Sequence, residues 1–143
     1  MKLDNIKIGC DPELFIWDTN TDTPYPSVGL IGGTKSKPKF FSGKHMVQED
    51  NVLAEFGIPA TNKVEEFIGS INLCKEFIQS LLPKGFTIRV QASAYFDKNY
   101  LQTDQAKEFG CDPDFSAWTE SVNEKPDSDT NLRTSGKIVC HLN

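Results

Sequence analysis

The chain has 143 residues, which is enough for a single domain with a sizeable hydrophobic core. Hydrophobic residues make up 38% of it and charged residues 24%, as in ordinary globular proteins. The net charge of −5 gives no support for binding nucleic acid or an anionic membrane. The sequence contains no apolar run near the ~20 residues of a membrane span and no signal-peptide pattern. We therefore expect a protein of a reducing, cytoplasmic compartment.

The four cysteines lack the close Cys-x-x-Cys spacing that is typical of zinc sites. In a reducing compartment they are expected to be free thiols. Cys74 falls on the apolar face of a predicted helix, where it is most simply a small buried hydrophobic residue.

Strands and a glycine-rich loop are predicted for the N-terminal part of the chain. Apolar runs with β-forming residues indicate strands, and clusters of Asp, Asn, Thr and Gly indicate turns. Pro12 is expected to kink the first strand region, because proline cannot donate a ladder hydrogen bond. In chain order we predict extended segments at 6–9 and 13–18 and a polar turn at 18–23. A glycine-rich loop with two lysines follows at 29–38, and one long strand at 47–58.

One long helix dominates the predictions for the remaining part. Apolar residues recur every three or four positions over 62–82, with a capping-box start at Asn62 and Glu65 and a stop at Pro83. Four further elements are predicted: a strand of alternating apolar and polar residues at 86–96, a short helix at 103–108, a loop at 120–135 and the beginning of a strand at 138–142. This order favours an α+β fold, a mainly antiparallel sheet with one long helix packed on it.

Acidic residues gather in two of the predicted strands. Asp11 and Glu13 are two positions apart, so an extended backbone directs both carboxylates to one face. In the next long strand, Glu49 and Glu55 likewise share a face with Asn51. Oxygen donors are the ligands that Mg²⁺ and Mn²⁺ prefer, so the four carboxylates are candidate metal ligands. A solvated acidic sheet edge stays open as the alternative.

Two cationic positions are candidates for binding an anion. Lys35 or Lys37 in the glycine-rich loop is placed to reach an anionic substrate, and a hairpin turn with solvated lysines is the competing interpretation. Arg133 lies in a polar loop and is the candidate for a bidentate contact with phosphate or carboxylate. An ordinary surface arginine is the alternative there.

Seven short motifs are spread over almost the whole chain. They read GCDPE at 9–13, GLIGGTK at 29–35, VQEDNV at 47–52, AEFGIP at 54–59, FGCDPDF at 109–115, AWT at 117–119 and TNLRT at 130–134. Together they resemble a phage family of carboxylate–amine ligases, the type-two group, which is related to glutamine synthetase and glutamate–cysteine ligase. The first motif is similar to the Gly-x-Glu-x-Glu strand on which glutamate–cysteine ligases bind metal.

The resemblance implies the N-terminal part of a glutamine-synthetase-like catalytic fold. It also implies dependence on ATP and on Mg²⁺ or Mn²⁺: a substrate carboxylate takes the γ-phosphate, and an amine then displaces phosphate to form an amide. The implied partners are small-molecule or peptide carboxylates and amines, in the host cytoplasm if the protein is encoded by a phage. The implied site residues are metal ligands at Asp11, Glu13, Glu49 and Glu55, a nucleotide contact at Lys35, and a catalytic and nucleotide contact at Arg133.

One departure from the family concerns the C-terminal residues. Relatives follow the Arg-Thr segment with a strand carrying Gly-Gly-His-x-His and a further part of the catalytic sheet, and residues 135–143 lack that pattern. We therefore expect residues 1–143 to form one incomplete ligase-like domain, inactive or split, that self-associates or lacks a C-terminal part. Two other classes stay open, a divalent-metal phosphohydrolase and a non-catalytic binding module with an acidic face.

Overall fold

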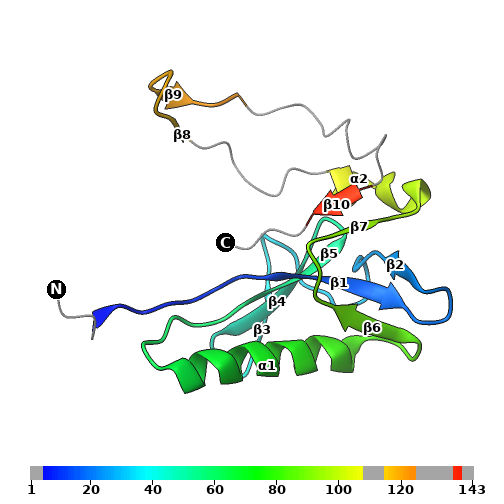
Figure 1. Cartoon of the computed structure of the whole chain (residues 1–143), viewed down its shortest axis with the longest axis horizontal. Helices are drawn as coiled ribbons and strands as arrows, with labels where there is room; N and C mark the ends of the chain where they lie inside the picture. Colours follow the sequence, from blue (N-terminus) through cyan, green and yellow to red (C-terminus); the bar gives the residue numbers. More distant parts are fainter. Residues whose placement is uncertain (1–4, 108–114, 125–136, 140–143) are drawn as a thin grey trace.

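A curled antiparallel sheet and one long helix form the framework of the protein (Figure 1). The computed structural model describes residues 5–107, 115–124 and 137–139. The described elements are β1 (Glu13–Asp18), β2 (Thr23–Tyr25), β3 (Lys39–Phe41), β4 (His45–Asp50), β5 (Leu53–Gly57), α1 (Val64–Leu81), β6 (Phe86–Arg89), β7 (Ser93–Tyr95), the 3-10 helix η2 (Lys98–Leu101), α2 (Asp104–Lys107), β8 (Phe115–Ser116), β9 (Ser121–Val122) and β10 (Lys137–Val139).

The main sheet is antiparallel at every described pairing. Its strand order is β2-β1-β5-β4-β3, and β6 also pairs with β1. In Figure 1, α1 covers one side of this sheet, while β7, α2 and β10 lie toward the other side. The arrangement confirms the predicted α+β class, with a mainly antiparallel sheet and one long helix packed on it.

A tight turn divides the long strand that we predicted over residues 47–58. Asn51 has a φ of +52°, a left-handed conformation that asparagine tolerates better than most residues, and the chain reverses there between β4 and β5. The prediction of one strand is wrong, because alternation of apolar residues does not reveal a turn that neither glycine nor proline marks.

Two other predicted strands are shorter than expected. The predicted strand 86–96 is divided into β6 and β7, and Val90 between them is 74% exposed. The segment 6–9 forms only an isolated antiparallel bridge between Ile8 and Thr61. By contrast, the strand predicted at 13–18 is confirmed by β1.

The C-terminal predictions are partly testable within the described residues. The short helix expected at 103–108 is confirmed by α2. The loop expected at 120–135 begins instead with β9, which pairs with β8, and its residues 125–135 lie outside the described part. Of the strand expected at 138–142, residues 138 and 139 belong to β10, which pairs with β7.

Helix α1 buries one face against the sheet. Cys74 and Ile78 are fully buried there, in a core formed with Leu14, Ile16, Ile31, Val47, Ala54, Phe56 and Ile58. Ile88 also packs against this core, whereas Val52 belongs to a different cluster. The helix is therefore held by apolar contacts that the 3.6-residue period of its sequence anticipates.

The start of α1 differs from the predicted capping box. Lys63 is the N-cap residue and makes no side-chain cap, so Asn62 and Glu65 do not form the expected reciprocal pair. Thr61 substitutes for it in part, because its Oγ1 accepts from the Lys63 N–H at 3.1 Å and donates to Glu66 Oε2 at 2.7 Å.

A second core joins the sheet to the later elements. It consists of apolar side chains from β1, β5, β7, η2, α2 and β10, from the β4–β5 turn and from the residue after β7, namely Phe15, Val52, Leu53, Ala94, Phe96, Leu101, Ala106 and Ile138. Phe15 and Phe96 lie with ring centroids 6.0 Å apart. Because neighbouring residues of β1 project to opposite faces, Leu14 and Phe15 enter different cores. No helix in the described part of the chain is long and apolar enough to cross a membrane.

Candidate functional site

Carboxylates from three strands project to one face of the sheet. Glu13 of β1 pairs directly with Glu55 of β5, and Glu55 pairs with Gln48 of β4. Directly paired residues of antiparallel strands project to the same side, and so do residues two positions apart. Asp50 therefore lies on this side as well. The register alone brings three acidic side chains to the same face.

Asp11 extends this face toward the N-terminus. The Phe56 N–H donates to the Pro12 carbonyl at 3.2 Å, and the Ile58 N–H donates to the Cys10 carbonyl at 3.1 Å. These bonds continue the β1–β5 register past the end of β1 and place Asp11 on the same side as Glu13. We use the name carboxylate face for Asp11, Glu13, Asp50 and Glu55, together with the amide of Gln48.

Glu55 is the most buried carboxylate of this group, with 8% of its surface exposed. Burial is the main cause that raises its pKa from 4.5 to about 7. The Gln48 Nε2 donates to Glu55 Oε2 at 2.8 Å and opposes that shift. A hydrogen bond with Asp50 and the charges of Asp50 and Asp11 raise the pKa further. Near pH 7 Glu55 is thus protonated in about half of the molecules, and a bound cation would displace that proton.

Glu49 projects to the opposite face of the sheet and binds the backbone of the glycine-rich loop. It pairs with Ala54, so the expectation that Glu49 and Glu55 share a face is wrong, and the β4–β5 turn is the reason. Its Oε1 accepts from the backbone N–H groups of Ile31 at 3.3 Å and Gly32 at 2.8 Å. The Gln105 Nε2 donates to the other oxygen at 3.5 Å. Glu49 therefore fastens the glycine-rich loop to β4.

The glycine-rich loop brings Lys35 to the carboxylate face. The Lys35 Nζ lies 3.9 Å from Asp50 Oδ2, and its side chain is 55% exposed. A bridge between Thr34 and Lys37 closes the tight turn that presents it. Glu49 already occupies the Ile31 and Gly32 N–H groups, so the candidates in this loop for contact with an anion are its two exposed lysines, Lys35 and Lys37.

Sequence reasoning missed Gln48 and Asp50. Both were hidden by the assumption of one continuous strand, in which they alternate with Glu49. The signal that reveals them is the Asp50-Asn51 pair, since both residue types favour turns. We expected Asn51 to share a strand face with Glu49 and Glu55. It is instead the turn residue, and its Nδ2 donates to the Gln105 carbonyl at 3.1 Å.

Several predicted positions lie outside the described residues. These are Arg133, the second Gly-Cys-Asp-Pro motif at 110–113, and the cysteines Cys111 and Cys140. Their predicted roles stay predictions.

The carboxylate face is not assembled as a closed metal cage. Within residues 5–107, 115–124 and 137–139, no group of three or more His, Cys, Asp or Glu side chains could hold a metal ion as it stands. The donor set itself suits a hard divalent ion, because it consists of carboxylate and amide oxygens. Binding would thus require these side chains to draw together around the ion.

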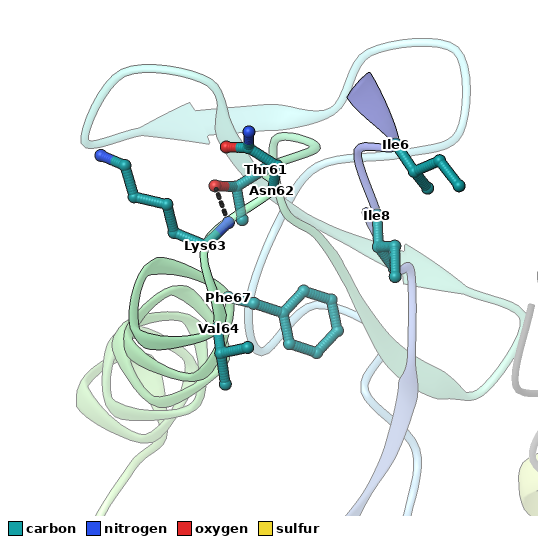
Figure 2. A pocket seen from close by; sticks show the side chains of 7 residues that line it. All are labelled: Ile6, Ile8, Thr61, Asn62, Lys63, Val64 and Phe67. Atoms are coloured by element: carbon teal, nitrogen blue, oxygen red, sulfur yellow. Dashed lines mark hydrogen bonds between the residues drawn. The ribbon is translucent and has the colours of Figure 1, made fainter. Parts of the chain in front are cut away.

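An apolar cavity lies at the other end of the segment that leads into β1. Its volume is about 320 Å³, and Figure 2 shows Ile6 and Ile8 on one side and Val64 and Phe67 on the other. Thr61, Asn62 and Lys63 complete the lining. None of these residues is acidic, so this cavity is distinct from the carboxylate face.

No protein-family model matches this chain, and no curated protein or solved structure shows significant similarity to it. The resemblance to carboxylate–amine ligases therefore rests on the sequence motifs.

Proposed function

We propose that this chain carries the metal-binding strands of an ATP- and Mg²⁺-dependent carboxylate–amine ligase with a glutamine-synthetase-like fold. The observation that supports it best is the direct pairing of Glu13 with Glu55, flanked on the same face by Asp11 and Asp50. The motifs of the sequence supply the reaction class, and the antiparallel sheet supplies the surface.

The residues of the carboxylate face would hold Mg²⁺ or Mn²⁺, with Asp50 in the place that we expected for Glu49. The bound ion would neutralise the triphosphate of ATP while a substrate carboxylate takes the γ-phosphate and an amine then replaces phosphate. Gln48 keeps the Glu55 carboxylate oriented through its 2.8 Å hydrogen bond. Lys35 would contact a phosphate oxygen, and Arg133 would provide a second cationic contact.

The balance of charge supports a polyanionic ligand only with a metal. Four carboxylates beside one lysine would repel ATP, because like charges are unfavourable at close range. A divalent ion offsets most of this negative charge and can bind the phosphate oxygens directly. The proposal therefore requires that nucleotide binding depend on the divalent ion.

The first test measures binding of Mn²⁺ and then of Mn²⁺ with ATP by isothermal titration calorimetry at about pH 8, where Glu55 is largely ionised. Glu13→Gln and Glu55→Gln should each weaken Mn²⁺ binding about 10- to 100-fold. Glu76→Gln, at an exposed position of α1, is the matched control and should bind like the wild type. Equal Mn²⁺ affinity in all four proteins would exclude the carboxylate face as the metal site.

The second test measures phosphate release from ATP with Mg²⁺ and pooled carboxylates and amines. Release that requires both a carboxylate and an amine supports the ligase. Release without an amine would identify a phosphohydrolase instead, and metal-independent ATP binding would contradict the proposal.

A further inference from the structure

The segment that leads into β1 has one open edge. On its other edge, the Ile8 N–H donates to the Thr61 carbonyl at 2.8 Å and the Thr61 N–H donates to the Ile8 carbonyl at 3.0 Å. Successive residues of an antiparallel strand direct their backbone groups to opposite edges, so those of Lys7, Gly9 and Asp11 point away from Thr61. Among the described residues, none forms a backbone hydrogen bond with these three.

Exposed apolar side chains accompany this open edge. Ile6 and Ile8 line the cavity beside α1 and are 42% and 59% exposed (Figure 2). Lys7 and Asp11 alternate with them and project to the opposite face of the sheet. An edge that combines free N–H and carbonyl groups with exposed apolar side chains is a template for an added strand.

The charges of the segment are complementary to those of a second copy. In an antiparallel pairing of two copies centred on Gly9, Lys7 of each copy lies opposite Asp11 of the other, and each opposed pair exchanges two backbone hydrogen bonds. On the other face Ile8 lies opposite Cys10, so apolar side chains meet. A register centred on Lys7 or on Asp11 would instead place like charges opposite one another.

Pro12 leaves the open edge intact. Its carbonyl accepts from the Phe56 N–H at 3.2 Å, so the position where it lacks an N–H faces β5 and not the open edge. Residues 6–11 carry one lysine and one aspartate, so two copies do not repel one another there in spite of the net charge of −5 of the whole chain.

We propose that two copies of this chain associate by antiparallel pairing of residues 6–11 about a two-fold axis at Gly9. The pairing continues the sheet of one copy into that of the other, and the same surface serves both copies. Because the interface is confined to a short segment, the dimer should be weak and should form only at high protein concentration. This inference does not depend on the proposed ligase function.

The first test is sedimentation equilibrium from about 10 μM to about 1 mM protein. EDTA is present, because Asp11 is also a proposed metal ligand. The wild type should show a monomer–dimer equilibrium. Lys7→Glu and Asp11→Lys should each weaken it about 10- to 100-fold, because each places like charges opposite one another at two positions. Lys84→Glu, at an exposed position between α1 and β6, is the matched control and should associate like the wild type.

An equimolar mixture of the two variants gives a sharper test. Pairing a Lys7→Glu copy with an Asp11→Lys copy places unlike charges opposite one another at both positions. The mixture should therefore form a mixed dimer about as strong as that of the wild type, although neither variant associates well alone. A mixture that stays monomeric, or single variants that both dimerise like the wild type, would overturn the proposal.

Hydrogen exchange of the wild type locates the interface without any substitution. The amides of Lys7, Gly9 and Asp11 should exchange more slowly as the protein concentration rises, since each gains an acceptor in the dimer. The Ile8 amide already donates to Thr61 and should change much less. A chain that stays monomeric up to about 1 mM, or a dimer in which the three amides exchange as in the monomer, would refute the pairing.

Discussion

The pH dependence of stability tests the burial of Glu55 directly. Folding raises the pKa of Glu55 from its ordinary value of 4.5 to about 7, because the carboxylate is buried beside Asp50 and Asp11. The folded state then binds the proton more tightly than the unfolded state does. The resulting stability is fully present below about pH 4.5 and is lost as the pH rises through about 7.

The size of the effect follows from the shift. At 1.36 kcal/mol per pKa unit, the difference between 4.5 and about 7 corresponds to about 3 kcal/mol, and partial screening by solvent reduces this to about 2–3 kcal/mol. Glu55→Gln cannot ionise and keeps an amide oxygen for the Gln48 Nε2. We therefore expect the variant to be about 2–3 kcal/mol more stable than the wild type at about pH 8 and close to it at about pH 4.5.

The assay is urea unfolding followed by circular dichroism at several pH values, with EDTA present to remove divalent ions. Glu76→Gln is the matched control and should keep the slope of the wild type, because Glu76 is exposed on α1. A Glu55→Gln variant with the wild-type slope between about pH 5 and 8, or with lower stability at about pH 8, would refute the reasoning.

Three further predictions concern the framework. Ile78→Ala should lower the free energy of unfolding by about 2–5 kcal/mol because Ile78 is fully buried under α1, whereas Ile68→Ala, at a residue 54% exposed, should lower it much less in the same urea titration. Glu49→Ala should leave the Ile31 and Gly32 N–H groups without their acceptor, lower stability by about 1–3 kcal/mol and speed hydrogen exchange of these two amides; unchanged exchange would mean that Glu49 does not hold the loop. Gly33→Ala should destabilise more than Gly29→Ala: both glycines have positive φ, but only at Gly33 would a Cβ meet the Val47 carbonyl at 2.7 Å, and equal thermal midpoints would contradict this contact.

The spacing of apolar and polar residues along the sequence determined the individual helices and strands. The 3.6-residue period anticipated α1 and its buried Cys74, and the apolar run at 13–18 anticipated β1. Two-residue spacing also placed Asp11 and Glu13 on one face. These features are local, since each depends on residues within a few positions of one another.

The tertiary structure decided which side chains meet. The turn at Asn51 divides β4 from β5, exchanges Glu49 for Asp50 on the carboxylate face and releases Glu49 to bind a loop 17 residues away. It also brings Lys35 to Asp50, and packing of α1 on the sheet brings Cys10 and Cys74 into one core. Such contacts depend on strand register, and a shift of one residue would send each side chain to the opposite face, so a single unrecognised turn was enough to change the predicted site.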